Sequence, residues 1–409
     1  MSPGTPLVLA INAGSSSIKF ALYRMAGAPQ RLLRGNLDRI GLPGTKLTFE
    51  DAVRKDEGVR ECGTLDQAAA ARLLLDWLDE RVGLAAIAAV GHRVANGGAW
   101  LREPQPVTPE LLDELRLISA YSPEHLPAEI ALVERFGERV PRLPQVACFD
   151  TTFHRELPRV AKMLALPRRL QQKGVERLGF HGLSYAFLME ELARVAGATH
   201  ARGRVILAHL GNGASVAAVR DGRSVDTSMG FTPAAGLPMS TRAGDLDPGL
   251  VLFLAQTEGM TAEQFHRMVN RESGLLGISE TTSDVRDLLA REASDVRAAE
   301  ALALFCYQVK KWIGAFAAAL GGVDTLVFAG GIGENAPAMR ARICDGLAFL
   351  GIELDAGRND AGDGVVSSDA SRVDVRVIRT DEEVIIAKAA AEVLQVPAGT
   401  PNTSSRSKP

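Results

Sequence analysis

The chain has 409 residues, which is too long for one compact core and fits two domains or one duplicated architecture. Hydrophobic residues make up 46% of it and charged residues 23%, the ordinary balance of a soluble globular protein. The formal net charge of −3 gives no reason to expect nucleic acid or an anionic membrane as a partner.

The cysteines and the beginning of the chain bear on the compartment. Cys62, Cys148, Cys306 and Cys344 show neither a CxxC pair nor a Cys/His metal spacing, so we expect buried thiols in a reducing compartment. The first basic residue is Lys19, whereas a secretory signal carries its positive charge at the very start. These observations predict a cytoplasmic protein.

Short apolar runs typical of strands alternate with amphipathic segments typical of helices. The runs are LVLAI, FALYR, AAVGHRV, QVACFD, RVILAHL, SVAAV, TLVFAGG and VDVRVI, at residues 7–11, 20–24, 88–94, 145–150, 204–210, 215–219, 325–331 and 373–378. Residues 64–82 and 297–320 place apolar side chains three and four positions apart, as one face of a helix does. The alternation predicts an α/β fold. Residues 397–409, PAGTPNTSSRSKP, lack apolar anchors, and residues 396–409 are predicted to be a disordered tail.

One apolar stretch, residues 312–333, is long enough to need a membrane check. Asp324 interrupts it and several glycines punctuate it. A buried helix followed by a buried strand explains it better than a membrane span, so we expect no membrane partner.

The first two apolar runs are separated by AGSSSIK (13–19), a turn rich in small hydroxyl residues. Glycine lets successive backbone N–H groups approach a phosphate closely, serine adds hydroxyl donors, and Lys19 could reach the same anion. The turn is not a Walker loop, because GxxxxGK[ST] is absent and a strand follows rather than a helix. From these residues alone, a phosphate loop and a plain tight hairpin both remain open.

Two later segments also place a glycine-rich turn after an apolar run. Residues 205–223, VILAHLGNGASVAAVRDGR, again join two strand-like runs through a glycine turn, which suggests a duplicated fold, with two unrelated hairpins as the alternative. Residues 328–336, FAGGIGENA, follow an apolar run, and Gly331-x-Gly333-x-x-Ala336 resembles a dinucleotide fingerprint with Glu353 about 20 residues on. Too little chain remains for the sheet that this fingerprint needs. A strand-to-helix turn packed against an adenosine is the better interpretation.

Nine segments, in this order, resemble the acetate kinase family. They are INAGSSSIKF, GHRVANGG, FDTTFH, GFHG, HLGNGAS, TRAGDLDP, SGLLGIS, FAGGIGEN and TDEE, and together they cover nearly the whole chain. The resemblance implies the duplicated, ribonuclease H-like α/β fold of the actin, Hsp70 and sugar kinase superfamily, in which ATP binds in a cleft between two domains. It implies a first domain of residues 1–150 completed by a helix at about 383–395, and a second domain of residues 151–382. It also implies a homodimer joined through the second domain.

The implied reaction is the reversible, Mg²⁺-dependent, in-line transfer of the ATP γ-phosphoryl group to acetate, giving acetyl phosphate and ADP. Such a transfer needs aligned reactants and positive charge around the moving group. By resemblance Arg93 and Arg242 supply that charge, since a guanidinium can hold a carboxylate or phosphate with two parallel hydrogen bonds. His181 is expected to donate to the transferring phosphoryl oxygen.

Asp150 is commonly assigned in this family as a proton donor or acceptor. A carboxylic acid substrate has a pKa near ~4 to 5, so it arrives ionised at pH 7 and needs no deprotonation. We therefore expect Asp150 to orient an arginine or to hold a metal-bound water.

The resemblance also assigns the metal and nucleotide contacts. Asn12 and Glu382 are expected to hold Mg²⁺, with Mn²⁺ as an alternative, because hard cations prefer oxygen ligands. The residues expected to bind ATP or ADP are Lys19; His209, Leu210, Gly211, Asn212 and Gly213; Asp284, Val285 and Arg286; and Gly331, Ile332, Gly333, Glu334 and Asn335.

The expected acyl pocket departs from the family pattern. Ala95 stands where the family has a bulky aliphatic residue, so propionate is expected to fit, although one methylene discriminates by only roughly 1–3 kcal/mol. Glu124 stands where an apolar residue is expected, so either it turns away from a carboxylate substrate or the substrate differs. Leu178, Leu183 and Tyr185 replace Tyr, Thr and His, whereas the substrate contacts Arg93, His125, Phe180 and Pro233 are retained.

Several functions are compatible with this pattern. An acetate kinase is favoured, a propionate kinase with the same mechanism is its alternative, and a butyrate kinase fits the motifs less well. A nucleotide-driven binding protein of the Hsp70 or actin kind and a non-catalytic relative belong to another class. Both are disfavoured because the whole set is intact: Asn12, Lys19, Arg93, Asp150, His181, Arg242 and Glu382.

Overall fold

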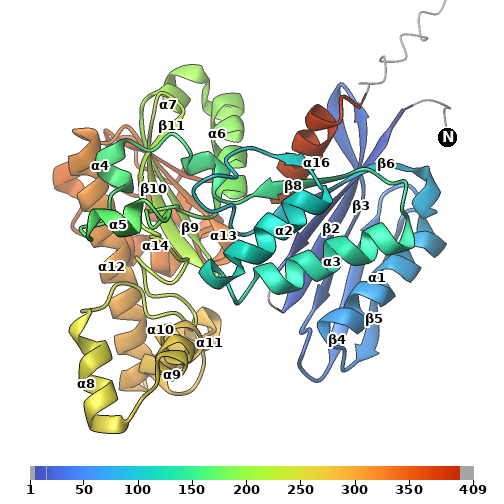
Figure 1. Cartoon of the computed structure of the whole chain (residues 1–409). Helices are drawn as coiled ribbons and strands as arrows, with labels where there is room; N and C mark the ends of the chain where they lie inside the picture. The colour runs from blue at the N-terminus through green and yellow to red at the C-terminus, as the bar shows by residue number, and fades with distance from the viewer. Residues whose placement is uncertain (1–4, 15, 397–409) are drawn as a thin grey trace, which may run out of the picture. The chain divides into compact units, whose positions relative to one another are not determined.

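The computed structural model of the chain describes residues 5–14 and 16–396. It divides into two compact units, one formed by Met1–Thr152 with Asp381–Pro409 and the other by Phe153–Thr380 (Figure 1). Apart from Val396, the predicted tail lies outside the described residues. Each unit is built around its own mixed sheet.

The first unit carries an eight-stranded sheet in the order β5-β4-β3-β2-β1-β6-β8-β7. Its strands are β1 (Leu7–Ala13), β2 (Ser17–Ala26), β3 (Ala28–Asp38), β4 (Thr45–Asp51), β5 (Asp56–Gly63), β6 (Ile87–Val94), β7 (Gln105–Pro106) and β8 (Gln145–Phe149). Its helices are α1 (Gln67–Arg81), α2 (Pro109–Ile118), α3 (Leu126–Arg139) and α16 (Glu382–Val393).

Side-chain alternation in β1 explains how helices come to cover both faces of this sheet. Leu7, Leu9 and Ile11 pack with residues of α1 and α3 in one apolar core. Asn12 points to the other face, where it meets the start of α16. The C-terminal helix α16 packs there on β1, β2, β6 and β8. A Cβ on Gly91 of β6 would lie only 2.6 Å from Ile386 of α16, so this close approach requires glycine.

The second unit carries a five-stranded sheet in the order β11-β10-β9-β12-β13. Its strands are β9 (Arg204–Leu210), β10 (Ala214–Arg220), β11 (Arg223–Thr227), β12 (Thr325–Ala329) and β13 (Asp374–Val377). Its helices are α4 (Arg159–Lys162), α5 (Arg168–Gln171), α6 (Gly182–Ala196), α7 (Ala198–Arg202), α8 (Gly249–Glu258), α9 (Ala262–Arg267), α10 (Gly274–Ser279), α11 (Val285–Arg291), α12 (Val296–Leu320), α13 (Gly330–Asn335), α14 (Pro337–Cys344) and α15 (Ala356–Ala361).

The two sheets share one topology. In the first, β1, β2 and β3 are antiparallel neighbours, and β6 and β8 extend the sheet in parallel on the other side of β1. In the second, β9, β10 and β11 are the antiparallel strands, and β12 and β13 extend it in parallel beyond β9. The predicted duplicated α/β fold is confirmed. Both glycine turns lie in hairpins, β1–β2 and β9–β10.

The long apolar stretch at 312–333 contains a helix end and a strand, as predicted. Helix α12 begins at an Asp295 cap and ends at Gly321, whose φ of 71° closes it in the left-handed conformation. Strand β12 follows with every residue buried. Within the described part of the chain, no helix is long and apolar enough to cross a membrane.

All four cysteines are free thiols. Cys148, Cys306 and Cys344 are buried, and that burial raises the pKa of each thiol. The prediction of a buried thiol is wrong for Cys62, which is half-buried because it lies on β5, the edge strand of the sheet.

Candidate active site

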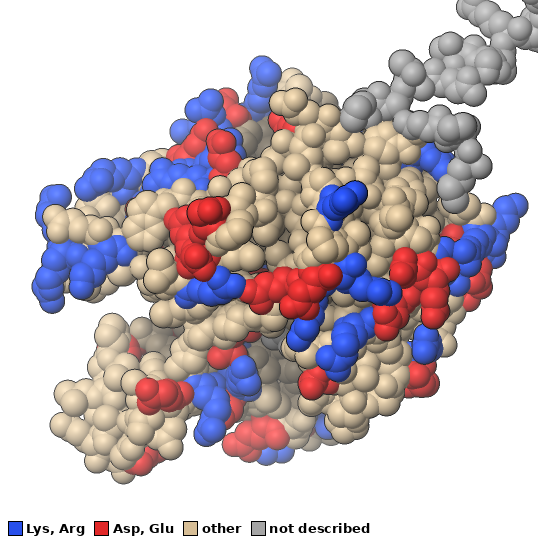
Figure 2. Space-filling model, turned by 45° about the vertical axis from the view of Figure 1, so that its right-hand side comes forward, with Lys and Arg blue, Asp and Glu red and all other residues tan. Residues whose placement is uncertain are grey.

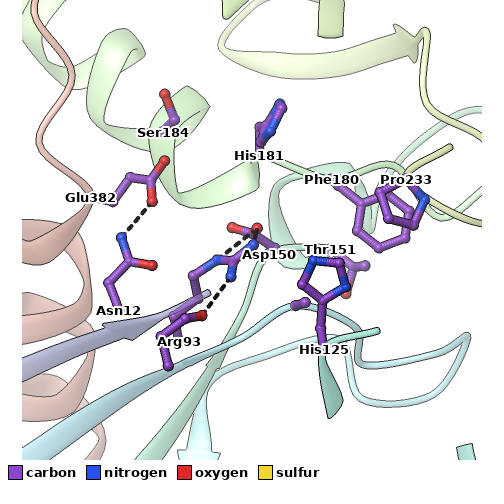
Figure 3. A network of polar contacts seen from close by, with 12 residues as sticks. Asn12, Arg93, His125, Asp150, Thr151, Phe180, His181, Ser184, Pro233 and Glu382 are labelled. Carbon is purple, nitrogen blue, oxygen red and sulfur yellow. Dashed lines mark hydrogen bonds and ion pairs between the residues drawn. The ribbon is translucent and has the colours of Figure 1, made fainter. Parts of the chain in front are cut away.

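In the first unit, a largely buried arginine near the end of one strand pairs with a carboxylate that follows the neighbouring strand. Arg93 is the penultimate residue of β6, and Asp150 directly follows β8, the parallel neighbour of β6. The Nη2 and Nε of Arg93 donate to Asp150 Oδ2 at 2.6 and 3.0 Å, and Nη1 donates to the Ala13 carbonyl at 3.0 Å (Figure 3). Carboxyl ends of parallel strands are where α/β folds place ligands.

Burial alone lowers the pKa of Arg93, but the carboxylates of Asp150, Glu129 and Glu382 outweigh it. The pKa therefore lies above its ordinary value, and the guanidinium stays charged. Only 13% of the side chain is exposed. A fixed cation with little access to water is suited to holding an anion firmly.

Glu129 is a member of this network that the sequence analysis missed. It lies in the first turn of α3, is almost fully buried, and accepts a hydrogen bond from the Ala95 amide at 2.9 Å. Its Oε1 lies 3.5 Å from Arg93 Nη1. Desolvation raises its pKa to about 7 and Asp150 adds to the rise, while Arg93 and the Ala95 amide oppose it. The signal in the sequence is a carboxylate enclosed by the apolar run LPAEIAL.

A second cluster joins the two ends of the first unit. Asn12 Nδ2 donates to Glu382 Oε2 at 2.8 Å (Figure 3) and also to Glu383 Oε1 at 2.9 Å. Burial raises the pKa of both glutamates. Asp150 adds to the rise at Glu382, whereas Lys19, which faces Asn12 across the β1–β2 pair, lowers the pKa of both.

Asp150 Oδ1 is buried and has no hydrogen-bond partner among the residues that the structure describes. An orphaned buried carboxylate oxygen needs a partner such as a cation or an ordered water. Together with Glu382 and the amide oxygen of Asn12, it makes a set of hard oxygen donors in a region with excess negative charge. Such a set fits a hydrated Mg²⁺ ion.

In the second unit, His181 is fixed by a chain of hydroxyl groups. It precedes α6 with a φ of 60°, the left-handed conformation. Its Nδ1 lies 2.8 Å from Ser215 Oγ, and Ser215 Oγ lies 2.5 Å from the Tyr185 hydroxyl. The His181 ring also stacks on His209, with centroids 4.3 Å apart. Tyr185, one of the departures from the family pattern, thus completes the contact chain that orients His181.

Other predicted residues of this unit gather beside His181. A Cβ on Gly213 would lie 3.0 Å from His181 Nε2 and 3.5 Å from Arg242 Nη1. Arg242 Nη1 also donates to the Pro233 carbonyl at 3.4 Å. The Phe180 carbonyl lies 3.1 Å from His154 Nε2, which ties that segment to the core. A cation, an imidazole and a glycine turn therefore lie together.

The two glycine turns predicted to bind the nucleotide lie side by side. Gly211 and Gly331 approach so closely that a Cβ on Gly211 would lie 3.7 Å from the Gly331 amide. Gly330 has a φ of 75°, and a Cβ there would lie 2.7 Å from the Leu210 carbonyl, so only glycine fits. The turns follow β9 and β12, which are parallel neighbours.

The polar side chains of the second turn stabilise the turn itself. Glu334 Oε1 accepts from the amides of Gly330 and Thr380, and Asn335 donates to the Gly331 carbonyl. Ile332 and Gly333 lie within the same short helix, α13. In the first turn, the Asn212 carbonyl accepts from the Ser240 amide at 3.3 Å.

The remaining predicted residues have local contacts. Asp284 caps α11 and pairs with Arg286, whose side chain is 89% exposed, and Val285 between them is buried. His125 Nδ1 lies 3.5 Å from Ser122 Oγ, just before α3. Ala95, Leu178 and Leu183 are buried, whereas Glu124 is half-buried.

Comparison with known proteins identifies the family. The family model described as the acetokinase family matches residues 7–388. An acetate kinase of Rhodopseudomonas palustris is 44% identical over 389 residues, covering 93% of this chain and 97% of that protein. The solved structure of a propionate kinase from Francisella tularensis matches with a TM-score of 0.88 and 34% identity, covering 95% of this chain and all of that one. The Porphyromonas gingivalis acetate kinase structure gives 0.83 and 36%, with the same coverage. The chain belongs to the acetokinase family.

Proposed function

We propose that this protein is an acetate kinase, an ATP:acetate phosphotransferase that reversibly makes acetyl phosphate and ADP by direct in-line transfer. The observation that carries the proposal is the buried Arg93–Asp150 pair at the strand ends of a chain that matches the acetokinase family over nearly its whole length. A cation in that place can receive the carboxylate of a small acid or the phosphoryl group that moves to it.

Charge stabilisation is the main contribution of the protein to this reaction, because phosphoryl transfer requires little covalent chemistry from it. We assign Arg93 to the acyl substrate and the transferring group, and Arg242 to the same phosphoryl group. His181 donates from Nε2 to a phosphoryl oxygen, since Nδ1 is engaged with Ser215. Each donor is held in place before the reaction, which avoids reorganisation in the transition state.

Asp150 acts as the residue that orients Arg93, not as a base. Its Oδ2 accepts two hydrogen bonds from the guanidinium, which fixes the plane of that group. The acid substrate is ionised at neutral pH, so no proton has to be removed. The second oxygen, Oδ1, is the one available to a water in the hydration shell of a metal ion.

Asn12 and Glu382 would hold Mg²⁺, or Mn²⁺ in its place. The ion would supply charge neutralisation between the ATP phosphates. A cation there would stabilise the ionised forms of the two glutamates that accept from the Asn12 amide, because burial raises the pKa of both and Lys19 opposes the rise only in part.

The adjoining turns at 209–213 and 330–335 are the proposed nucleotide site. Their backbone N–H groups and the close approach allowed by glycine suit phosphates and an adenosine. Lys19 is proposed as a further contact to the phosphates. Asp284, Val285 and Arg286 are proposed to contact the nucleotide as well. Arg286 would do so by rotating its exposed side chain.

Propionate is the second candidate substrate. Ala95 leaves more room than a larger aliphatic residue would, and one matching solved structure is a propionate kinase. Phe180, Pro233 and His125 are the other proposed pocket residues. Glu124 is only half-buried, which lets its carboxylate remain in water.

We further propose a cytoplasmic homodimer joined through the second unit. Helix α8 has no buried residue, although its sequence is GLVLFLAQTE, and Val251, Leu252 and Phe253 are about half exposed. In Figure 2 this lower-left part of the unit is largely uncharged. A groove of about 450 Å³ lined by residues of loop 236–246 and α12, including Trp312, lies on the same unit. Exposed apolar surface of this kind marks a protein interface.

The dimer is tested by light scattering. Phe253→Glu should give monomers, whereas Val160→Glu, at a still more exposed apolar site on α4, should leave the dimer intact. A dimer that survives Phe253→Glu, or a monomeric wild type, would contradict this surface.

The reaction is tested by kcat/KM for acetate, propionate and butyrate with MgATP, trapping the acyl phosphate with hydroxylamine. Arg93→Ala and Arg242→Ala should each lower turnover by orders of magnitude. Arg34→Ala and Arg194→Ala, which break exposed ion pairs with Glu50 and Glu191, should leave it unchanged. Better use of propionate would change the substrate but not the mechanism. No turnover of any acid would favour a non-catalytic nucleotide-driven binding protein.

A further inference from the structure

Arg93 has one positive charge and two buried carboxylates in direct contact with it, and Glu382 adds to the negative charge around it. Asp150 takes the stronger position, with two hydrogen bonds of 2.6 and 3.0 Å. Glu129 has only a 3.5 Å contact with Nη1, while its other oxygen accepts from the Ala95 amide. Arrival of a substrate carboxylate at Arg93 would bring a third negative charge to the same guanidinium. One of these three carboxylates has to lose its negative charge, because like charges in a buried site repel strongly.

The surroundings of Glu129 indicate that it is the carboxylate that loses its charge. It lies on α3, which packs on α1, α2 and β6. The charged groups that act on Glu129 are Arg93 of β6 and Asp150, which directly follows β8. Helix α2 presents Leu111, Leu115 and Ile118 to the apolar core that it shares with α3, and α1 presents Leu74, Leu75 and Leu78.

Other charged groups of these helices pair with one another. Arg116 of α2 pairs with Asp113 and with Glu134 of α3, and Arg135 pairs with Glu138. Asp76 and Asp79 of α1 pair with Arg139 at the opposite end of α3. His125 and Glu124 precede the helix and are half-buried. Arg93 is thus the cation that balances Glu129.

We propose that Glu129 is a positioning residue which shares Arg93 before substrate binds and takes up a proton from solvent when the substrate carboxylate occupies that guanidinium. The neutral carboxyl group releases Arg93 to the substrate. Its Oε2 can still accept from the Ala95 amide, so the backbone at the proposed pocket wall stays in place. This inference rests on the proposed function, in which Arg93 receives the acyl substrate.

Burial already prepares Glu129 for this step. Its side chain is 3% exposed, and desolvation raises its pKa to about 7, so protonation at neutral pH costs little. Below that pH the residue is already neutral and substrate binds without proton uptake. Above it, the proton has to be taken from solvent, and binding weakens with each further unit of pH.

The test is the pH dependence of KM for acetate, measured from pH 6 to 9 with kcat recorded in parallel. In the wild type, KM should be flat below about pH 7 and then rise by up to about tenfold per pH unit, with kcat little changed. In Glu129→Gln, whose amide resembles the protonated carboxyl group, KM should remain low throughout. Asp51→Asn is the matched control, because Asp51 is also a buried carboxylate bound to an arginine, Arg81, and to backbone amides. It should keep the wild-type profile.

Proton uptake can also be counted directly in the unsubstituted protein. Acetate is titrated calorimetrically at pH 8 in two buffers of different ionisation heat, and about one proton should be taken up per acetate bound. Coincident KM curves for wild type and Glu129→Gln, or no proton uptake by the wild type, would overturn the inference while leaving the proposed function standing. If the wild type turns over no carboxylic acid, the proposed function fails and this inference falls with it.

Discussion

Replacing Gly91 by alanine tests whether the C-terminal helix is seated on the first sheet as closely as the structure shows. The added Cβ would lie 2.6 Å from Ile386 Cγ2, 2.9 Å from the Ile386 carbonyl oxygen and 3.1 Å from Ala390 Cβ. A methyl group can rotate away, but the carbonyl cannot. Helix α16 therefore has to move by about half an ångström, and overpacking of this kind costs about 1–3 kcal/mol of unfolding free energy.

Gly314→Ala is the matched control. It makes the same change within α12, where a Cβ would meet nothing within 4 Å, so it should raise the unfolding free energy by about 0.5–1 kcal/mol through helix propensity. Urea unfolding is followed by tryptophan fluorescence: Trp77 and Trp100 report on the first unit, which contains Gly91, and Trp312 reports on the second unit, which contains Gly314. The same shift of α16 should raise KM for MgATP, because Glu382 is the first residue of that helix.

A Gly91→Ala protein that unfolds at the wild-type urea concentration would refute the close packing of α16 on β6. Loss of stability with unchanged KM for MgATP would keep the packing and remove Glu382 from the proposed metal site.

Three further predictions concern the acyl pocket, the orientation of the histidine and the response to acid. Ala95→Val should lower kcat/KM for propionate about tenfold more than for acetate, and an equal loss would show that Ala95 is no pocket wall. Tyr185→Phe removes the tyrosine hydroxyl that contacts Ser215 Oγ, and it should lower kcat while KM for acetate and ATP stays nearly unchanged. An unchanged kcat would show that this hydroxyl does not help to orient His181. Burial lowers the pKa of His92 from 6.5 to about 4, so the folded state binds fewer protons than the unfolded state between these values. The contribution of neutral His92 to the unfolding free energy, up to about 3 kcal/mol, is complete above about pH 6.5 and is lost towards pH 4. The unfolding free energy of His92→Gln should therefore fall less steeply over that range than that of the wild type. Parallel curves for the two proteins would contradict this.

The local sequence pattern predicted the individual strands and helices, but it did not predict the order of the strands in the two sheets. The apolar runs at 7–11 and 204–210 predicted strands, and the short turns after them predicted hairpins, because both features depend on neighbouring residues. The parallel pairing of β1 with β6 joins segments about 80 residues apart, and periodicity alone does not specify such partners. The repeated strand–turn–strand pattern suggested a duplicated fold, and the family resemblance supplied its topology.

In the candidate site, too, the local sequence does not specify contacts between segments that are far apart in the chain. The resemblance brought Asn12 and Glu382 to one expected site, and the structure places them 2.8 Å apart. Glu129 was missed because a glutamate in the first turn of an amphipathic helix ordinarily faces solvent and complements the helix dipole. Tyr185 was noticed as a departure, but its contact with Ser215 depends on how α6 meets β10.

The return of the chain to its first unit sets the order in which a newly made molecule can become complete. Residues 153–380 are contiguous and can fold as soon as they leave the ribosome, so the unit that is second in sequence is the first to finish. The earlier unit has to wait with β1, β6 and β8 uncovered on one face until α16 is synthesised. Asn12 also waits for Glu382, so an unfinished or truncated chain lacks the pair proposed to hold Mg²⁺. If this pair holds Mg²⁺ as proposed, a chain that lacks α16 cannot bind the metal ion there.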